Sequence, residues 1–328
     1  MKSASWDCML DVRMIAYRPP FWLPDGHLQT IVAALRPPPR VALARERWDT
    51  PDGDFIDVDW AGRRDATRTL VLFHGLEGSS DSHYARDFAA YAIERDWRIA
   101  LPHFRGCSGE PNRLPRAYHS GDSAEIDWIL RRVAASSPAV HAAGVSLGGN
   151  ALLKWLGEQS SAATGIVRRA AAICAPLDLT AAGRALDRSF NRAVYTRMFL
   201  ATLKKKALDK LARFPGLYDA ERVRAAQSFH EFDSLVTATL HGFRDAEDYW
   251  RKSSSAPLLP GVRVPTLVLN SRNDPFLPGA ALLAATREVS SEVLLEHPPQ
   301  GGHVGFLEAP FPGRHGWLAR RVFEFLAG

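Results

Sequence analysis

The chain has 328 residues, of which 46% are hydrophobic and 23% charged, a composition typical of a globular protein with a large core. Lys and Arg number 41 and Asp and Glu 36, so the net charge of +5 is a mild excess that gives no basis for predicting nucleic-acid binding. No apolar run approaches the roughly 20 residues that a membrane-spanning helix needs. The first ten residues, MKSASWDCML, lack the uninterrupted apolar stretch of a signal peptide. Contact with a membrane is therefore expected to be peripheral at most.

The three cysteines, Cys8, Cys107 and Cys174, are odd in number and widely spaced. They neither form a disulfide framework nor match the spacing of metal ligands. We therefore predict a cytoplasmic protein without a metal or organic cofactor.

Residues 1–40 are predicted to be irregular. The aromatic segment FWLPDGHLQT, residues 21–30, is expected to pack across the core, and the run of prolines at 37–39 is a stiff spacer. Residues 45–49 and 55–60 then alternate in polarity on either side of the turn Pro51-Asp52-Gly53, which predicts an antiparallel hairpin.

From residue 69 onward, short apolar strands alternate with helices. The predicted strands are 70–73, 98–101, 140–143 and 170–175, and the predicted helices are 84–95, 123–135 and 151–156. Strands that are apolar on both faces indicate a mostly parallel sheet covered by helices on both sides. The predicted fold class is therefore α/β with a doubly wound sheet, which binds ligands at the carboxyl ends of its strands.

The segment Gly144-Val145-Ser146-Leu147-Gly148 follows one of these strands and precedes a helix. It matches the nucleophile-elbow pattern G-x-S-x-G, in which a serine on a sharp turn exposes its Oγ. The alternative for this segment alone is a turn of small residues without chemistry. The strand, turn and helix order favours Ser146 as a nucleophile.

Two loops can supply the hydrogen-bond donors that an acyl-transfer site needs for its oxyanion. The loop after strand 70–73 contains Leu76, and Leu147 follows the nucleophile. We predict that the backbone N–H groups of Leu76 and Leu147 form the oxyanion hole. In the first loop, His74 and Glu77 are interpreted as braces in preference to catalytic groups.

The loop after strand 98–101 contains Arg105 and Cys107. Arg105 either braces this loop or meets the substrate, and bracing is preferred. Cys107 is interpreted as a small packing residue, because no partner histidine for a second nucleophile can be assigned.

Between Asp178 and Trp250 the strands stop and a helix-rich segment follows. We interpret it as an inserted cap that acts as a lid over the substrate, and the alternative is a set of scaffold helices. The domain prediction is core at 1–177, cap at 178–255 and core again at 256–328. Within the cap, the basic run 204–206 is interpreted as a solvated helix face, with an anionic membrane surface or an acidic substrate as the alternative.

After the cap, strands are predicted at 266–270 and 293–296, and a helix at 317–325. Asp274 follows the first of these strands and His303 the second, in the order serine, acid, histidine that this layout requires. The imidazole would take the serine proton and the carboxylate would orient the imidazole. Asp178 is a competing acid that alternatively caps the first cap helix, and His297 is a weaker candidate base than His303.

With these residues assembled, the chain resembles the α/β-hydrolase superfamily, and within it the YheT-like esterase branch, which is related to eukaryotic hydrolases with lipid-ester and acyltransferase activities. The resemblance covers nearly the whole chain through the segments FWLPDGHLQT, LFHGLEGSSDSHYARDFA, HFRGCSGEPNR, YHSGD, GVSLGGN, NDP and GGHVGF. The family's triad maps onto Ser146, Asp274 and His303. The resemblance implies hydrolysis of carboxylic esters and leaves the substrate open.

The expected function is a carboxylesterase-type serine hydrolase that acts on a small-molecule ester with a short- or medium-chain acyl group. Two alternatives are kept. One is acyl transfer or lipid-ester cleavage by the same triad, and the other is a binding protein on a hydrolase scaffold. The sequence does not indicate an oligomeric state.

Overall fold

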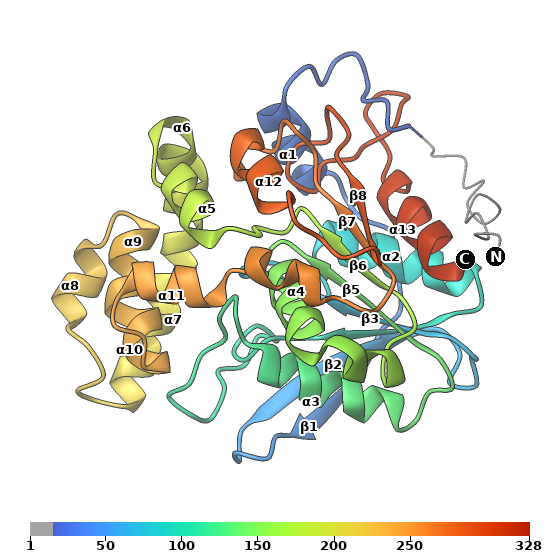
Figure 1. Cartoon of the computed structure of the whole chain (residues 1–328). Helices are drawn as coiled ribbons and strands as arrows, with labels where there is room; N and C mark the ends of the chain where they lie inside the picture. Colours follow the sequence, from blue (N-terminus) through green and yellow to red (C-terminus); the bar gives the residue numbers. More distant parts are fainter. Residues whose placement is uncertain (1–15) are drawn as a thin grey trace, which may run out of the picture.

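An eight-stranded sheet runs through the computed structural model, which describes residues 16–328 (Figure 1). The strand order is β1-β2-β4-β3-β5-β6-β7-β8. Strands β1 and β2 form an antiparallel hairpin, β2 pairs antiparallel with β4, and all other pairs are parallel. The strands are Ala44–Asp49 (β1), Phe55–Ala61 (β2), Thr69–Phe73 (β3), Arg98–Pro102 (β4), Val140–Val145 (β5), Ala170–Ile173 (β6), Thr266–Leu269 (β7) and Val293–Glu296 (β8).

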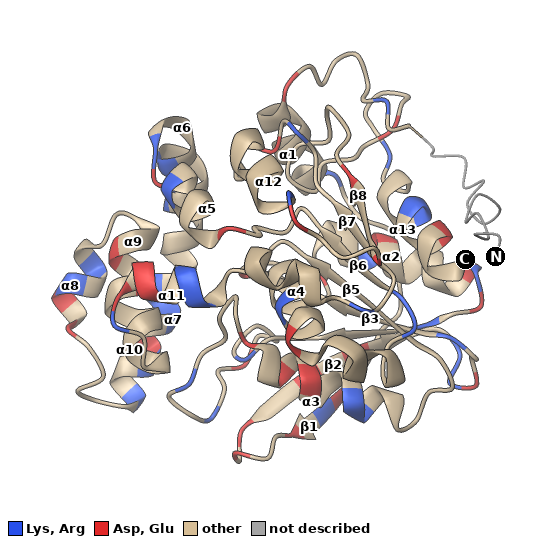
Figure 2. Cartoon of the chain, viewed as in Figure 1, with Lys and Arg blue, Asp and Glu red and all other residues tan. Residues whose placement is uncertain are grey.

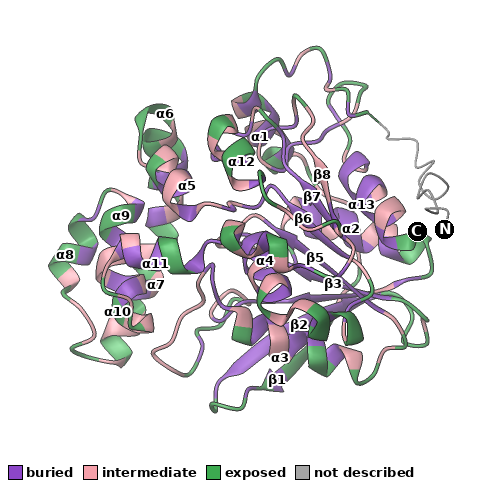
Figure 3. Ribbon diagram, viewed as in Figure 1, coloured by how far each residue is buried: buried purple, intermediate pink, exposed green. Residues whose placement is uncertain are grey.

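Helices cover both faces of this sheet. Apolar side chains of α3 (Ser123–Ala134), α4 (Leu147–Gln159) and α12 (Gly279–Ala285) pack on one face, and those of α2 (His83–Glu94) and α13 (Trp317–Ala327) pack on the other. Strands β3, β5, β6 and β7 are buried along their whole length (Figure 3). The predicted doubly wound α/β fold and its N-terminal hairpin are confirmed.

Residues 26–35 form a helix, α1 (Gly26–Leu35), so the prediction of irregular structure is wrong for this segment. Asp25 is its N-cap, with a carboxylate that accepts hydrogen bonds from the N–H groups of His27 (2.8 Å) and Leu28 (3.0 Å). The helix has only ten residues and lies between prolines, so its helical periodicity is difficult to recognise in the sequence. The expectations for residues 1–15, Cys8 included, lie outside the described residues.

The chain between β6 and β7 adds no strand to the sheet and forms a group of helices at one end of it (Figure 1). Two turns in this stretch, η2 and η3, have π-helical hydrogen bonding, and 3-10 turns lie before β6 at Ser160–Gly165 (η1) and just before β7 at Ala256–Gly261 (η4). Its elements are Leu179–Leu186 (α5), Ser189–Asn191 (α6), Arg192–Thr196 (η2), Arg197–Arg213 (α7), Ala220–Ala225 (α8), Phe229–Phe232 (α9), Asp233–Thr237 (η3), Ala238–His241 (α10) and Ala246–Ser253 (α11). We call this segment, residues 179–253, the cap.

The cap has apolar clusters of its own. One joins α5, α9 and α11, and a second joins α7, α8, α9 and η3. Charged residues are frequent on the outer helices of the cap (Figure 2). None of the helices within residues 16–328 combines the length and the apolar character needed to cross a membrane.

Candidate active site

Ser146 lies on a sharp turn between β5 and α4, with φ +52° and ψ −118°. A positive φ is unusual for a residue with a side chain, and it is typical of a position held under strain at a functional site. The turn also needs glycine, because a Cβ at Gly148 would press against the carbonyl groups of Phe73 and His74. The local structure is therefore that of a nucleophile elbow.

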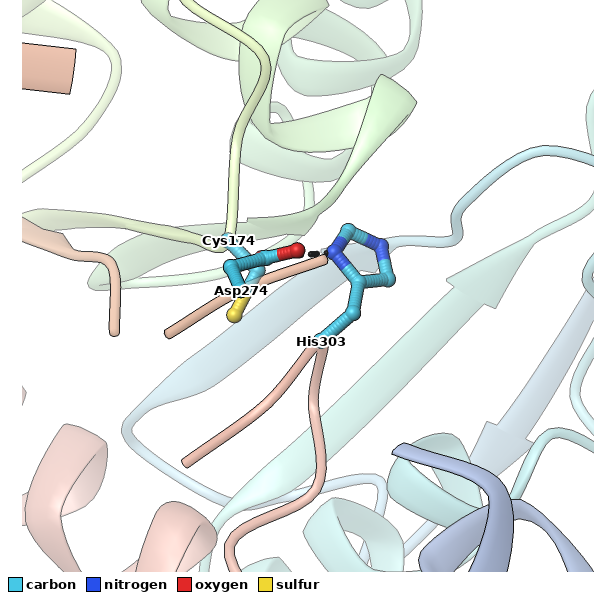
Figure 4. Close-up of side chains that lie close together, drawn as sticks. All are labelled: Cys174, Asp274 and His303. Atoms are coloured by element: carbon cyan, nitrogen blue, oxygen red, sulfur yellow. Dashed lines mark hydrogen bonds and ion pairs between the residues drawn. The ribbon is translucent and has the colours of Figure 1, made fainter. Parts of the chain in front are cut away.

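Asp274 and His303 lie on the loops after β7 and β8 and form a hydrogen bond with each other (Figure 4). His303 Nδ1 is 2.8 Å from Asp274 Oδ2, and the side chain of Asp274 is fully buried while that of His303 is 10% exposed. Since the carboxylate can only accept at this contact, Nδ1 carries the proton and Nε2 is left as the acceptor. The other carboxylate oxygen, Oδ1, accepts the N–H of Phe276 at 2.8 Å, and the ring of Phe276 packs against the imidazole with centroids 4.2 Å apart.

A cavity of about 580 Å³ lies between the cap and the carboxyl edge of the sheet. Ser146 and His303 both line it, as do Leu76 and Leu147. Among residues 16–328, no backbone carbonyl or side chain accepts a hydrogen bond from the N–H of Leu76 or of Leu147. Both N–H groups are thus available to a ligand at the place where Ser146 would react. The structure brings all the predicted site residues to one edge of the sheet.

His74 braces the loop that carries Leu76. Its Nε2 accepts the N–H of Phe104 at 3.0 Å, so Nδ1 is the protonated nitrogen and donates to the carbonyl of Gly75 at 2.7 Å. Burial lowers the pKa of His74 to about 3, which keeps the ring neutral. The side chain therefore holds the loop in place and has no ring nitrogen free for catalysis.

Glu77 links this loop to the cap. Its carboxylate accepts the hydroxyl of Tyr118 and the ammonium of Lys206, both at 2.8 Å. Lys206 Nζ also lies 3.5 Å from Cys107 Sγ, and burial raises the pKa of that thiol to about 11. Cys107 is thus a protonated packing residue at neutral pH. The prediction of a solvated face at 204–206 is wrong for Lys206, because its ammonium turns toward the core domain.

The other candidate residues from the sequence analysis lie outside the group formed by Ser146, Asp274 and His303. Arg105 is buried and pairs with Asp54 and Glu125 at 3.1 and 2.5 Å, so it braces its loop. Asp178 is the N-cap of α5 and accepts the N–H of Ala181 at 3.1 Å. His297 does not line the cavity.

Cys174, at the carboxyl end of β6, is the site residue that the sequence analysis missed. Its Sγ accepts the N–H of Val304, next to His303, at 3.3 Å, and it lies beside Asp274 (Figure 4). The ligand atoms of Cys174, Asp274 and His303 lie within 4.8 Å of one another. Burial raises the pKa of the thiol well above its usual value, and Asp274 and His303 bond each other, so this group does not fit a metal ion. Its position after a parallel strand, like those of the acid and the base, was the available signal.

The cap supplies the apolar wall of the cavity. Side chains of its helices α5, α7, α9 and α11 face the space above Ser146: Leu179, Leu186, Leu203, Phe229, Phe232 and Trp250. Asn150, in the elbow helix and fully buried, donates to the carbonyl of Ser253 at 2.8 Å and accepts the N–H of Ser255 at 3.0 Å. The helix that carries the nucleophile therefore also fixes the end of the cap.

Comparisons with known proteins agree with this fold. The family model described as alpha/beta hydrolase fold matches residues 68–310. The protein named Putative esterase YheT from Escherichia coli (strain K12) is 36% identical over 309 residues, which cover 92% of this chain and 89% of that protein. Phospholipase ABHD3 from Homo sapiens is 29% identical over 324 residues, or 94% of this chain and 78% of that protein.

Among solved structures, an esterase from Exiguobacterium antarcticum superposes with a TM-score of 0.58 at 15% identity, over 87% of this chain and 100% of that chain. This likeness shows the fold, and the sequence matches show the family. The fold and the family together define a hydrolase. The chain belongs to the α/β-hydrolase family and, within it, to the YheT-like branch.

Proposed function

We propose that this hydrolase cleaves carboxylic esters through an acyl-enzyme on Ser146. The observation that carries the proposal is the position of Ser146, a strained elbow residue, on the same cavity as the hydrogen-bonded pair of His303 and Asp274. The names of two relatives, a putative esterase and a phospholipase, support the proposal that the bond cleaved is an ester.

In the proposed mechanism, Ser146 Oγ attacks the ester carbonyl while His303 Nε2 accepts the hydroxyl proton. The N–H groups of Leu76 and Leu147 stabilise the oxyanion, and Asp274 stabilises the imidazolium. His303 then gives the proton to the leaving alcohol. Water, activated by the same imidazole, releases the acid and restores the serine.

The proposed substrate is a small ester with a short- or medium-chain acyl group, held under a cap that acts as a lid. The apolar wall formed by Leu179, Phe229 and Trp250 suits an alkyl chain. A lipid ester is the second candidate, favoured by the same wall and by the name of the human relative. Acyl transfer to an alcohol would use the same triad. The free thiols of Cys107 and Cys174 support a cytoplasmic location.

The test is a series of p-nitrophenyl esters from acetate to palmitate, assayed with the wild type and with Ser146→Ala. We expect one optimum of chain length and a loss of about 10⁴-fold or more in kcat for the variant, because the nucleophile is gone. Labelling of the wild type by a fluorophosphonate, absent in Ser146→Ala, identifies the reacting serine. A folded wild type that neither labels nor turns over any ester would favour a binding protein on a hydrolase scaffold.

A further inference from the structure

Helix α1 lies against both loops that carry the proposed acid and base (Figure 1). Gly26, its first residue, approaches the acid turn so closely that a Cβ there would overlap the carbonyl oxygen of Asn273, the residue before Asp274. Along the chain, Gln29 in this helix is 244 residues from Asn273 in the acid turn and 272 residues from Gly301 in the histidine loop. The contacts of the helix with these loops are polar as well as close.

Gln29 connects the acid turn to the histidine loop. The side chain is fully buried, and its Oε1 accepts the side-chain N–H of Asn273 at 3.0 Å and the backbone N–H of Gly301 at 2.8 Å. Its Nε2 donates to the carbonyl of Leu23 at 2.9 Å and to Oε1 of Gln300 at 2.7 Å. A buried amide with both its ends bonded holds its partners in one arrangement, because any shift leaves a polar group unpaired.

Thr30 contacts the histidine itself. Its Oγ1 accepts the backbone N–H of His303 at 2.8 Å and donates to the carbonyl of Gly26, one helical turn earlier, at 2.7 Å. The hydroxyl of Thr30 thus attaches the backbone of His303 to helix α1. The next residue, Val304, has φ +59°, a conformation that a β-branched residue adopts only when its surroundings impose it.

We infer that Gln29 and Thr30 are positioning residues for catalysis, which set the orientation of His303 toward Ser146 and of Asp274 toward His303. The inference rests on the proposed function for the triad. It goes beyond that function by giving a role in catalysis to two residues of α1, near the start of the sequence. A displacement of about 1 Å at a reacting group lowers a rate by up to about 10²-fold. These residues touch neither the cavity nor a reacting atom, so they act through the two loops.

The test compares Thr30→Val, which keeps the shape and removes the hydroxyl, with Thr30→Ser, which keeps the hydroxyl. Thr286→Val is the matched control, because Thr286 is also buried and donates to a carbonyl one turn earlier, that of Leu282 at 2.9 Å, and does not line the cavity. We expect kcat on the best p-nitrophenyl ester to fall at least tenfold in Thr30→Val with KM within twofold. Thr30→Ser is expected to stay within threefold of the wild type, and Thr286→Val within twofold at a similar change in Tm.

A kcat for Thr30→Val within threefold of the wild type, or a loss equal to that of Thr286→Val, overturns the inference. If Thr30→Val does not fold, Gln29→Met takes its place under the same criterion, since it keeps the length of the side chain and removes its hydrogen bonds. Retained labelling of Ser146 in the wild type separates this failure from a failure of the proposed function.

A measurement without substrate addresses the same geometry. The proton on Nδ1 of His303 is expected to give a low-field resonance, identified by its loss in His303→Ala. This resonance should shift in Thr30→Val and stay in place in Thr286→Val. An unchanged resonance in Thr30→Val contradicts the inference whether or not any ester is hydrolysed.

Discussion

A carboxylate at position 274 determines which ring nitrogen of His303 carries a proton. Asp274→Asn replaces the acceptor Oδ2 by an amide that presents either a donor or a weaker acceptor, so the imidazole adopts the wrong tautomer for part of the time. We expect kcat on p-nitrophenyl esters to fall by roughly 10³- to 10⁴-fold, by analogy with triads in general. Initial-rate assays of the purified variant measure the change in kcat.

Asp178→Asn is the matched control for this change. Asp178 follows the neighbouring strand and was the competing acid, but it caps α5, and asparagine is an equally good N-cap. Its kcat should stay within about threefold of the wild type. A large loss at Asp178 with a small one at Asp274 would reverse the assignment.

At this scale the sequence predicted three residues that follow strands, missed Cys174, which also follows a strand, and missed the residues that approach from elsewhere. Ser146, Asp274 and His303 are readable because a parallel sheet brings the carboxyl ends of its strands together. Gln29 and Thr30 are not, because a contact between α1 and the histidine loop depends on how the chain before the sheet folds back over it. Local pattern carries no information on such a contact.

Helix α7 attaches the cap to the core loop 105–116. Lys210 Nζ donates to Asn112 Oδ1 at 2.9 Å and to the carbonyl of Leu114 at 2.8 Å, and burial lowers the pKa of this lysine to about 8. Lys210→Met keeps the apolar stem and removes these bonds, together with a third to the carbonyl of Arg116 at 3.3 Å. We expect trypsin to cleave the loop at Arg113 and Arg116 several-fold faster, because the loop opens more often. Mass spectrometry of a timed digest locates and quantifies the cuts.

Lys205→Met serves as the control on the same helix, since Lys205 is exposed and removal of its charge should leave the rates of cleavage at Arg113 and Arg116 unchanged. Equal protection of the loop in both variants would mean that Lys210 does not hold it. The helix itself was predictable as part of a helical cap. Which of its lysines turn toward the core was not, because Lys205 and Lys206 are neighbours with opposite surroundings and the same residue type.

The stability of the whole molecule should depend on pH through Asp87, a buried residue of α2. Burial raises its pKa to about 7, with the negative charge of Glu308 as a smaller cause. The folded state therefore holds a proton that the unfolded state has already lost above about pH 4. The resulting stabilisation is complete below that pH and disappears as the pH rises through about 7.

Between pH 5 and pH 8, the free energy of unfolding of the wild type should fall by about 3 kcal/mol on this account, from two pH units at 1.36 kcal/mol each. Asp87→Asn should remove that part of the decline, as measured by urea unfolding at both pH values. Asp65→Asn, at an exposed site, is the control and should follow the wild type. Parallel curves for the wild type and Asp87→Asn would show that the carboxyl is not protonated in the fold.

The two ends of the cap lie side by side, where hydrogen bonds join residues 177–179 to residues 254–256. The N–H of Ala256 donates to the carbonyl of Leu177 at 3.1 Å, and the N–H of Leu179 donates to Ser254 Oγ at 3.0 Å. Residues 179–253 thus leave and return through one narrow neck between adjacent strands, and Ser146, Asp274 and His303 all lie outside them. In evolutionary terms this connection would let the cap be exchanged as a block, because such an exchange leaves Ser146, Asp274 and His303 on the core that carries them.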